Sequence, residues 1–120
     1  MSLSTLLNGG RKQTVREGID TKDIPYMSAA DFAATNPEFP VSLAGFFIKN
    51  GDYGEQVTII VMNGEDPTGL NIPKRYVDDF KDMDQDDIDA VINGELAIES
   101  IETNVKTPKG KTTMINFIRV

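Results

Sequence analysis

Few kinds of side chain in this chain are able to carry out catalysis. The 120 residues include no cysteine and no histidine, which excludes thiol nucleophiles, histidine-based triads and Cys/His zinc sites. Proton transfer would depend on carboxylates, lysine, tyrosine, serine or threonine alone. We expect no bound cofactor.

Negative charge is concentrated in one segment, DDFKDMDQDDID at residues 78–89. It contains seven aspartates and one lysine and so carries a charge of −6, out of a formal net charge of −7 for the whole chain. The remainder is close to neutral, and two basic segments stand out in it: RKQTVR at Arg11–Arg16 and KTPKGK at Lys106–Lys111. The acidity of the chain therefore does not exclude a polyanionic partner.

The aspartates also raise the question of a metal site. Asp82, Asp84 and Asp86 have the spacing of the first ligands of an EF-hand, but Asp87 stands where a glycine is expected and Asn93 where the closing glutamate is expected. A solvated helix face with capping aspartates explains the same residues. We predict no metal site. A metal-dependent nuclease that uses the aspartates of residues 82–89 is kept as one functional hypothesis.

Lysines and aromatic rings supply the pattern that a single-stranded nucleic acid requires. Nonspecific binding of a single strand needs cations along the backbone and rings on which bases stack. The candidate phosphate partners are Lys49, Lys106, Lys109, Lys111 and Arg119, the candidate stacking rings are Phe46 and Tyr53, and Arg11, Lys12 and Arg16 form a basic arm. Structural alternatives stand beside these roles. Arg119 could equally pair with Glu95 or the carboxy terminus, and Tyr53 could anchor its own loop. The lysines of Lys106–Lys111 could serve only solubility, and Arg11–Arg16 could be a disordered basic tail without fixed contacts.

The elements that position these residues are mostly strands. Residues 1–22 lack a periodic pattern and are expected to form a mobile arm or a partly ordered extension. SAADFAA then predicts a short helix with Ser28 as its N-cap. Strand patterns cover Val41–Ile48, Gln56–Met62, Gly69–Ile72, Leu96–Val105 and Thr112–Val120. The predicted organisation is an amino-terminal extension with a short helix over residues 1–40 and one domain over residues 41–120.

A helical insert separates the third predicted strand from the fourth. Pro73 suits a first helical turn, after which the apolar side chains share one face: Tyr76, Val77, Phe80 and Met83. Asp84 is expected to cap a second helix that ends at Asn93-Gly94. The aspartates of the insert then lie on its outward face.

Two hairpins join neighbouring strands. Thr107-Pro108-Lys109-Gly110 predicts a tight turn between the last two strands. For the first two strands we prefer a five-residue loop over Asn50–Gly54 to a two-residue Asn50-Gly51 turn. This register buries Val41, Leu43, Phe47, Val57, Ile59 and Val61, and it gathers Phe46, Ile48, Thr58, Ile60 and Met62 on the opposite face. A second face this apolar indicates a subunit interface, a covering segment or a ligand platform.

Five short strands with a helix between the third and fourth have the order of an OB fold, so we predict a mainly β, five-stranded Greek-key OB-fold barrel with a helical insert. The runs IKNGDYGEQVTIIV, NIPKRYVDDF and IESIETNVKTPKGKTTMINF resemble phage-encoded OB-fold single-stranded-DNA-binding proteins of the lactococcal siphophage type, over residues 41–120. The resemblance implies a non-enzymatic dimer or tetramer that protects single strands during phage replication and recombination. It also implies that the loops after the first and fourth strands flank the binding groove.

The leading hypothesis is therefore a sequence-nonspecific single-stranded-DNA-binding protein, although the residue pattern alone would suit RNA as well. The alternative is a protein-interaction module that docks a replication or recombination partner through the apolar outer face or the acidic insert. The longest apolar runs are too short to cross a bilayer, and the start of the chain lacks the residue order of a secretory signal. We expect a cytoplasmic protein without a membrane partner, in the host cell if the protein is phage-encoded.

Overall fold

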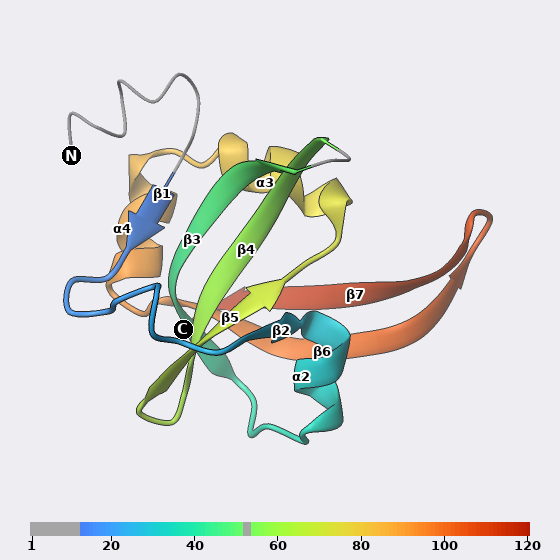
Figure 1. Cartoon of the computed structure of the whole chain (residues 1–120), viewed down its shortest axis with the longest axis horizontal. Helices are drawn as coiled ribbons and strands as arrows, with labels where there is room; N and C mark the ends of the chain where they lie inside the picture. The colour runs from blue at the N-terminus through green and yellow to red at the C-terminus, as the bar shows by residue number, and fades with distance from the viewer. Residues whose placement is uncertain (1–12, 52–53) are drawn as a thin grey trace.

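The computed structural model describes residues 13–51 and 54–120, and these residues form a mainly β protein with few helices (Figure 1). Its mixed sheet of seven strands curls into a half-barrel in the order β2-β5-β4-β3-β6-β7, and β1 pairs with β3 beside this path. The strands are β1 (Gln13–Val15), β2 (Tyr26–Ser28), β3 (Val41–Gly51), β4 (Gly54–Asn63), β5 (Asp66–Asn71), β6 (Leu96–Thr107) and β7 (Gly110–Arg119). The helical elements are α2 (Ala29–Ala34), the 3-10 turn η1 (Lys74–Tyr76), α3 (Val77–Lys81) and α4 (Gln85–Ile92).

The prediction of a mainly β fold is confirmed, and the strand count of five is wrong. The five predicted strands correspond to β3–β7, and the two additional strands, β1 and β2, come from the amino-terminal extension. β2 pairs in parallel with β5 and so occupies the outer edge of that strand. Among the described residues the sheet path runs from β2 to β7 without closing on itself.

The helix ends follow the predicted capping residues. Ser28 Oγ accepts a hydrogen bond from the Asp31 N–H at 3.0 Å, and Asp84 Oδ1 accepts one from the Asp87 N–H at 2.9 Å. Each cap satisfies one of the backbone donors that a helix N-terminus leaves without a partner. Gly94 follows α4 with a φ of +75°, a conformation that favours glycine. The helical insert between β5 and β6 is therefore present, as the sequence predicts.

The β3–β4 hairpin differs from the predicted register because β3 contains a bulge. Leu43 pairs with Val61 and Gly45 pairs with Ile60, so Ala44 is an extra residue on β3. The pairing predicted from the sequence agrees with the Leu43–Val61 pair. Beyond the bulge, each residue of β3 pairs with the residue of β4 that follows its predicted partner in the chain. Pairing then continues to Gly51 opposite Gly54, so the five-residue loop over Asn50–Gly54 is wrong.

The bulge exchanges the faces of two neighbouring phenylalanines. A shift of one residue turns each following side chain to the opposite side of a strand. Phe46 is 0% exposed and its ring lies 5.0 Å from that of Phe80 in α3, whereas Phe47 is only half-buried. The predicted core positions that lie outside the shifted half of β3 are confirmed: Val41, Leu43, Val57, Ile59 and Val61.

The outer face of β3, β4 and β5 is covered by the amino-terminal extension. At the centre of this face Ile60 pairs with Gly45 on one side and Gly69 on the other, and it is 0% exposed. The backbone of β1 lies over Gly45, and the ring of Tyr26 lies over Gly69. Of the three explanations offered for an apolar outer face, the covering segment is the one found.

Residues 13–15 and 26–28 therefore pair with strands of the sheet. For residues 13–15 this favours the partly ordered extension over the mobile arm. β1 runs antiparallel to β3, and the Arg16 N–H continues the ladder with a 2.7 Å bond to the Ala44 carbonyl. No helix among the described residues is long and apolar enough to span a membrane.

Candidate nucleic-acid interface

A groove with basic residues at its sides lies between α2, the end of β5 and the middle of β7. Its first part, about 580 Å³, is lined by polar side chains from five strands and from η1: Ser28, Lys49, Gln56, Asn71, Lys74 and Thr113. Its floor is apolar, formed by Val57, Ile72 and Pro73. We call this cavity and its continuation, described next, the basic groove.

The continuation, about 310 Å³, leads from the first part toward the β6–β7 hairpin. The two parts share Ala30 and Thr113, and the second adds Thr103, Asn104, Lys111 and Thr112. Two predicted phosphate partners, Lys49 and Lys111, therefore line adjoining cavities although they are far apart in the sequence. Both side chains are exposed.

The other two predicted hairpin lysines lie on the same projection. Lys106 is directly opposite Lys111 on the paired strands, and Lys109 is in the turn closed by Thr107 and Gly110. Like charges directly opposite each other on antiparallel strands destabilise a sheet. Residues 105–113 contain three lysines and no acidic residue, so the structure of the hairpin itself does not account for this charge.

Lys74 is a groove residue that the sequence analysis did not select. It belongs to η1, and a Cβ built on Gly54 would meet its Nζ at 2.7 Å, so the ammonium reaches the β3–β4 hairpin. The neighbouring Arg75 is tied to β7, where it donates to Thr112 Oγ1 at 2.7 Å and to the Thr113 carbonyl. The signal in the sequence was a Lys-Arg pair directly after a proline, which exposes two cations on a first helical turn.

The acidic helix α4 and the lysine-bearing β6–β7 hairpin lie toward opposite ends of the long axis. Figure 1 shows α4 at one end and the tip of the β6–β7 hairpin at the other. Six aspartates of residues 78–89 are exposed: Asp78, Asp79, Asp82, Asp84, Asp86 and Asp89. A polyanion is therefore attracted to the hairpin end and repelled from the α4 end.

Lys81 is the lysine of the acidic segment, and an ion pair holds it. Its Nζ lies 2.8 Å from Glu55 Oε1 on β4. The hydrogen bond and the charge of Glu55 raise the pKa of Lys81 above its ordinary value. Lys81 therefore serves the attachment of α3 to β4, and we do not include it in the interface.

The predicted stacking rings do not belong to the described groove. Phe46 is buried in the core, so its selection as a stacking ring is wrong, for the register reason given above. Tyr53 lies outside the described residues, as do Arg11 and Lys12. Tyr26 is an exposed ring on the outer face, 43% exposed, and it meets Phe47 edge to face with a centroid distance of 6.4 Å. Lys49 Nζ lies 6.0 Å from the centroid of Phe47.

Arg16 is a structural residue in this fold and not a phosphate partner. Its Nε donates to the Ile92 carbonyl at 3.0 Å, and its terminal nitrogen donates to the Leu43 carbonyl at 3.2 Å. These bonds join β1 to the end of α4 and to β3. The prediction for Arg16 assumed a free basic arm, and it fails because the arm is folded against the sheet at this position.

The Arg16→Ala variant should accordingly lose stability without a change in any oligonucleotide binding. Two partly buried hydrogen bonds to carbonyls correspond to about 1–2 kcal/mol of unfolding free energy. Urea unfolding followed by circular dichroism measures this loss, and a salt titration of oligonucleotide binding measures the number of phosphate contacts. A smaller salt dependence with unchanged stability would return Arg16 to the interface.

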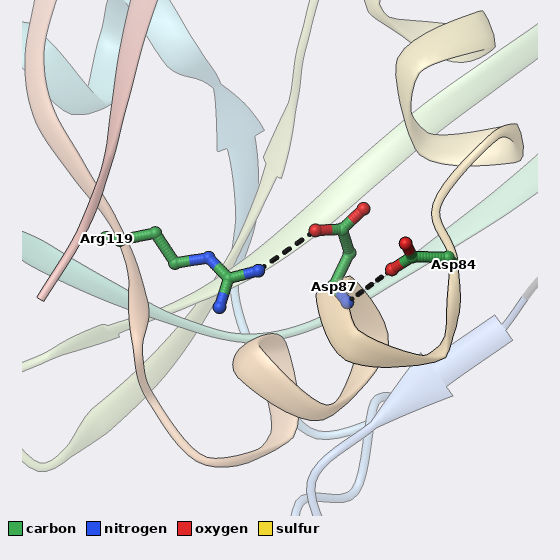
Figure 2. Close-up of polar contacts among 3 residues, drawn as sticks. All are labelled: Asp84, Asp87 and Arg119. Carbon is green, nitrogen blue, oxygen red and sulfur yellow. Dashed lines mark hydrogen bonds and ion pairs between the residues drawn. The ribbon is translucent and has the colours of Figure 1, made fainter.

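Arg119 likewise has a partner within the chain. Figure 2 shows its guanidinium extending from the end of β7 to Asp87 on α4, with 3.0 Å between the nitrogen and Asp87 Oδ1. The alternative prediction, that Arg119 pairs with an acidic group of the same chain, is confirmed. The partner is Asp87 and not Glu95 or the carboxy terminus. Arg119 lies at the acidic end of the molecule, away from the lysines of the basic groove.

Among residues 13–51 and 54–120, no group of three or more acidic side chains is arranged to hold a metal ion. Asp84 and Asp87 are engaged in the cap of α4 and, for Asp87, in the ion pair with Arg119 (Figure 2). The aspartates project from two short helices in place of converging on one point.

Comparison with known proteins gives no further assignment, because no protein-family model, no curated protein and no solved structure matches this chain.

Proposed function

We propose that this protein binds single-stranded DNA without sequence preference and that it is not an enzyme. The observation that carries the proposal is that lysines from two strands, Lys49 of β3 and Lys111 of β7, line the basic groove. Lys106 and Lys109 extend this set along the hairpin. The acidic end of the molecule lies opposite, so the charge distribution favours one orientation of a bound polyanion.

The groove suits a single strand in its chemistry as well as in its charge. Lysine ammonium groups along its sides neutralise phosphates, and release of counterions then drives binding. Gln56, Asn71 and Thr113 offer hydrogen bonds that do not depend on one base, and Val57 and Ile72 offer an apolar floor for bases or sugars. A duplex is stiff, whereas a single strand can follow a groove that bends between a helix and a hairpin.

The finer fold assignment, an OB-fold barrel, is also part of the proposal. The strands β3–β7 have the spatial order β5-β4-β3-β6-β7, with a helical insert between β5 and β6. This order corresponds to a five-stranded Greek-key barrel that is open between its third and fifth strands, and OB folds are partly open barrels. OB folds bind oligonucleotides through their second and third strands and the adjoining loops, and here the basic groove contacts β4, β5 and β7.

The resemblance to phage-encoded single-stranded-DNA-binding proteins supplies the remaining parts of the proposal. These are the choice of DNA over RNA, a role in phage replication and recombination, contact with proteins of those processes, a cytoplasmic location and a dimeric or tetrameric state. The apolar outer face is no longer an argument for self-association, because the extension covers it within the same chain.

Filter binding with single-stranded, double-stranded and RNA oligonucleotides of about 16 nucleotides, the upper site size for one OB fold, tests the proposal. We expect a preference for the DNA single strand at low salt. The logarithm of the binding constant should fall against the logarithm of the salt concentration with a slope of about −0.7 for each phosphate neutralised. Replacing Lys106, Lys109 and Lys111 by alanine should make the slope less negative by about 2 if each contacts a phosphate. The loss of affinity should be similar for oligonucleotides of every base sequence.

Lys22→Ala is the matched control for each single lysine variant. Lys22 is exposed, but it belongs to the loop between β1 and β2 and not to the basic groove or the hairpin. If Lys111→Ala loses affinity and Lys22→Ala does not, Lys111 belongs to a binding interface, because both variants change the net charge equally. Equal binding of single and double strands, or no binding at low salt, would rule the proposed function out.

A further inference from the structure

A small apolar pocket lies between the helical insert and the last two strands, at the acidic end of the molecule. It has a volume of about 230 Å³ and its walls include Tyr76, Phe80, Met83, Leu96 and Phe117. Four of these side chains are only partly buried although they pack against the core: Tyr76, Met83, Leu96 and Phe117. The pocket is therefore an opening onto the core and does not belong to the basic groove.

The three aromatic rings fix the shape of this pocket. Phe117 meets Tyr76 edge to face at 6.1 Å and Phe80 at 5.9 Å between ring centroids. The Tyr76 hydroxyl accepts a hydrogen bond from the Ile115 N–H at 2.9 Å, which anchors the ring to β7. Against these rigid walls, Met83 is an unbranched side chain that can adapt to different occupants.

The rim of the pocket is acidic. Asp79 and Asp87 line it directly, and Asp87 is also held by Arg119 (Figure 2). The remaining negative charge comes from Asp79 and from the other exposed aspartates of the same two helices: Asp78, Asp82, Asp84, Asp86 and Asp89. These charges repel phosphate groups and attract lysine and arginine.

Size, shape and charge together select the occupant. Sites for small molecules usually have volumes of about 300–1,000 Å³, so this pocket is better matched to one side chain than to a free ligand. Aromatic and methionine side chains are enriched at protein interfaces, and anchors that fill a pocket carry much of the binding energy.

We infer that this pocket docks one large apolar side chain of a lysine- or arginine-rich segment from a partner protein. The apolar anchor fills the space between Met83 and Phe117, and the flanking cations lie over the aspartates of α3 and α4. The pocket shares no lining residue with the basic groove, so a polyanion and a basic protein segment would bind to different surfaces. The inference does not depend on the proposed function.

Nuclear magnetic resonance of the ¹⁵N-labelled protein with short peptides tests this inference. The peptide KKFKK should shift amide signals of α3 and of residues next to the pocket, such as Leu96 and Phe117. KKAKK should bind about tenfold more weakly, because it lacks the apolar side chain. EEFEE should not bind, because the rim repels it.

Two variants locate the binding on the protein. Met83→Lys places a cation on the pocket wall and should abolish the response to KKFKK, and signal dispersion shows whether the fold is kept. Asp79→Lys changes an exposed rim residue and should weaken KKFKK binding without any risk to the core. Asp66→Lys, at the β4–β5 turn, is the control with the same change of charge, and its binding should be close to that of the unmodified protein.

Four outcomes would overturn the inference. These are equal binding of KKFKK and KKAKK, equal effects of Asp79→Lys and Asp66→Lys, shifts that cluster away from the pocket, and no response at peptide concentrations up to about 5 mM, which would detect even weak binding. A single-stranded oligonucleotide that shifts the same amides would instead make the pocket part of a nucleic-acid site. Filter binding is measured separately, so the inference can fail while the proposed function stands.

Discussion

Replacing Phe46 by alanine should lower the free energy of unfolding by about 3–5 kcal/mol, the usual cost of removing a buried phenylalanine. Phe46 is 0% exposed, and its ring packs at 5.0 Å from that of Phe80, which joins β3 to the helical insert. Domains are stable by only about 5–15 kcal/mol. The variant is therefore expected to unfold at a much lower urea concentration, as measured by circular dichroism.

Phe47→Ala is the matched control, because it removes the same side chain from the next residue. Phe47 is half-buried on the outer face, where it contacts the edge of Tyr26. We expect a loss of about 1–2 kcal/mol, since only part of its apolar surface is withdrawn from water. A larger loss for Phe47→Ala than for Phe46→Ala would contradict the bulge and restore the register predicted from the sequence.

The pair also protects the binding experiments from a false conclusion. Phe46 was selected from the sequence as a stacking ring, and Phe46→Ala would lower oligonucleotide affinity simply by unfolding the protein. Binding by this variant should therefore recover when it is measured at a temperature where the variant is folded. Recovery would show that the ring acts through stability and not through contact with bases.

Local signals in the sequence were sufficient for the strands and helices of residues 28–120. Ser28 and Asp84 cap the helices for which they were predicted, and the β6–β7 turn closes at Thr107 and Gly110. These features depend on neighbouring residues, so the pattern of a short segment determines them.

The alternation of residues in the sequence does not determine which side chains in the second half of β3 face the core. One extra residue, Ala44, reverses the alternation between Leu43 and Phe46. Both alternating patterns in FFI are equally apolar, so hydrophobicity does not choose between them. Gly45 was the available signal, because a glycine inside a strand pattern often marks a bulge or the close approach of another backbone.

The candidate interface was predicted only in part, for a related reason. Lys49 and Lys111, which line the basic groove, were selected because exposed lysines on strands and turns stand out in sequence. Arg16 and Arg119 were misassigned because their partners, the Ile92 carbonyl and Asp87, are far away in the chain. Long-range partners of a cation decide between a structural and a binding role, and they are defined only by the fold.

Gly45→Ala should destabilise the protein by about 2–3 kcal/mol, in the upper part of the range for overpacking. A Cβ on Gly45 would lie 2.6 Å from the Thr14 carbonyl oxygen and 2.8 Å from Val15 Cα. Both contacts are with the backbone of β1, so relief requires the strand to move as a whole. Such a movement also strains the bonds that Arg16 makes to Leu43 and Ile92.

Gly69→Ala makes a closer contact but should cost less, about 1 kcal/mol. Its Cβ would lie 2.3 Å from Tyr26 Cδ1, and this neighbour is a side chain that is 43% exposed. The ring can move outward without moving a strand, at the cost of the hydrogen bond that its hydroxyl donates to the Thr21 carbonyl. A double-mutant cycle separates the two cases. Tyr26→Ala should suppress the cost of Gly69→Ala and leave the cost of Gly45→Ala unchanged, as measured by urea unfolding. If Tyr26→Ala suppresses neither cost, the extension does not cover the outer face in solution, and Ile60 would become available to a partner.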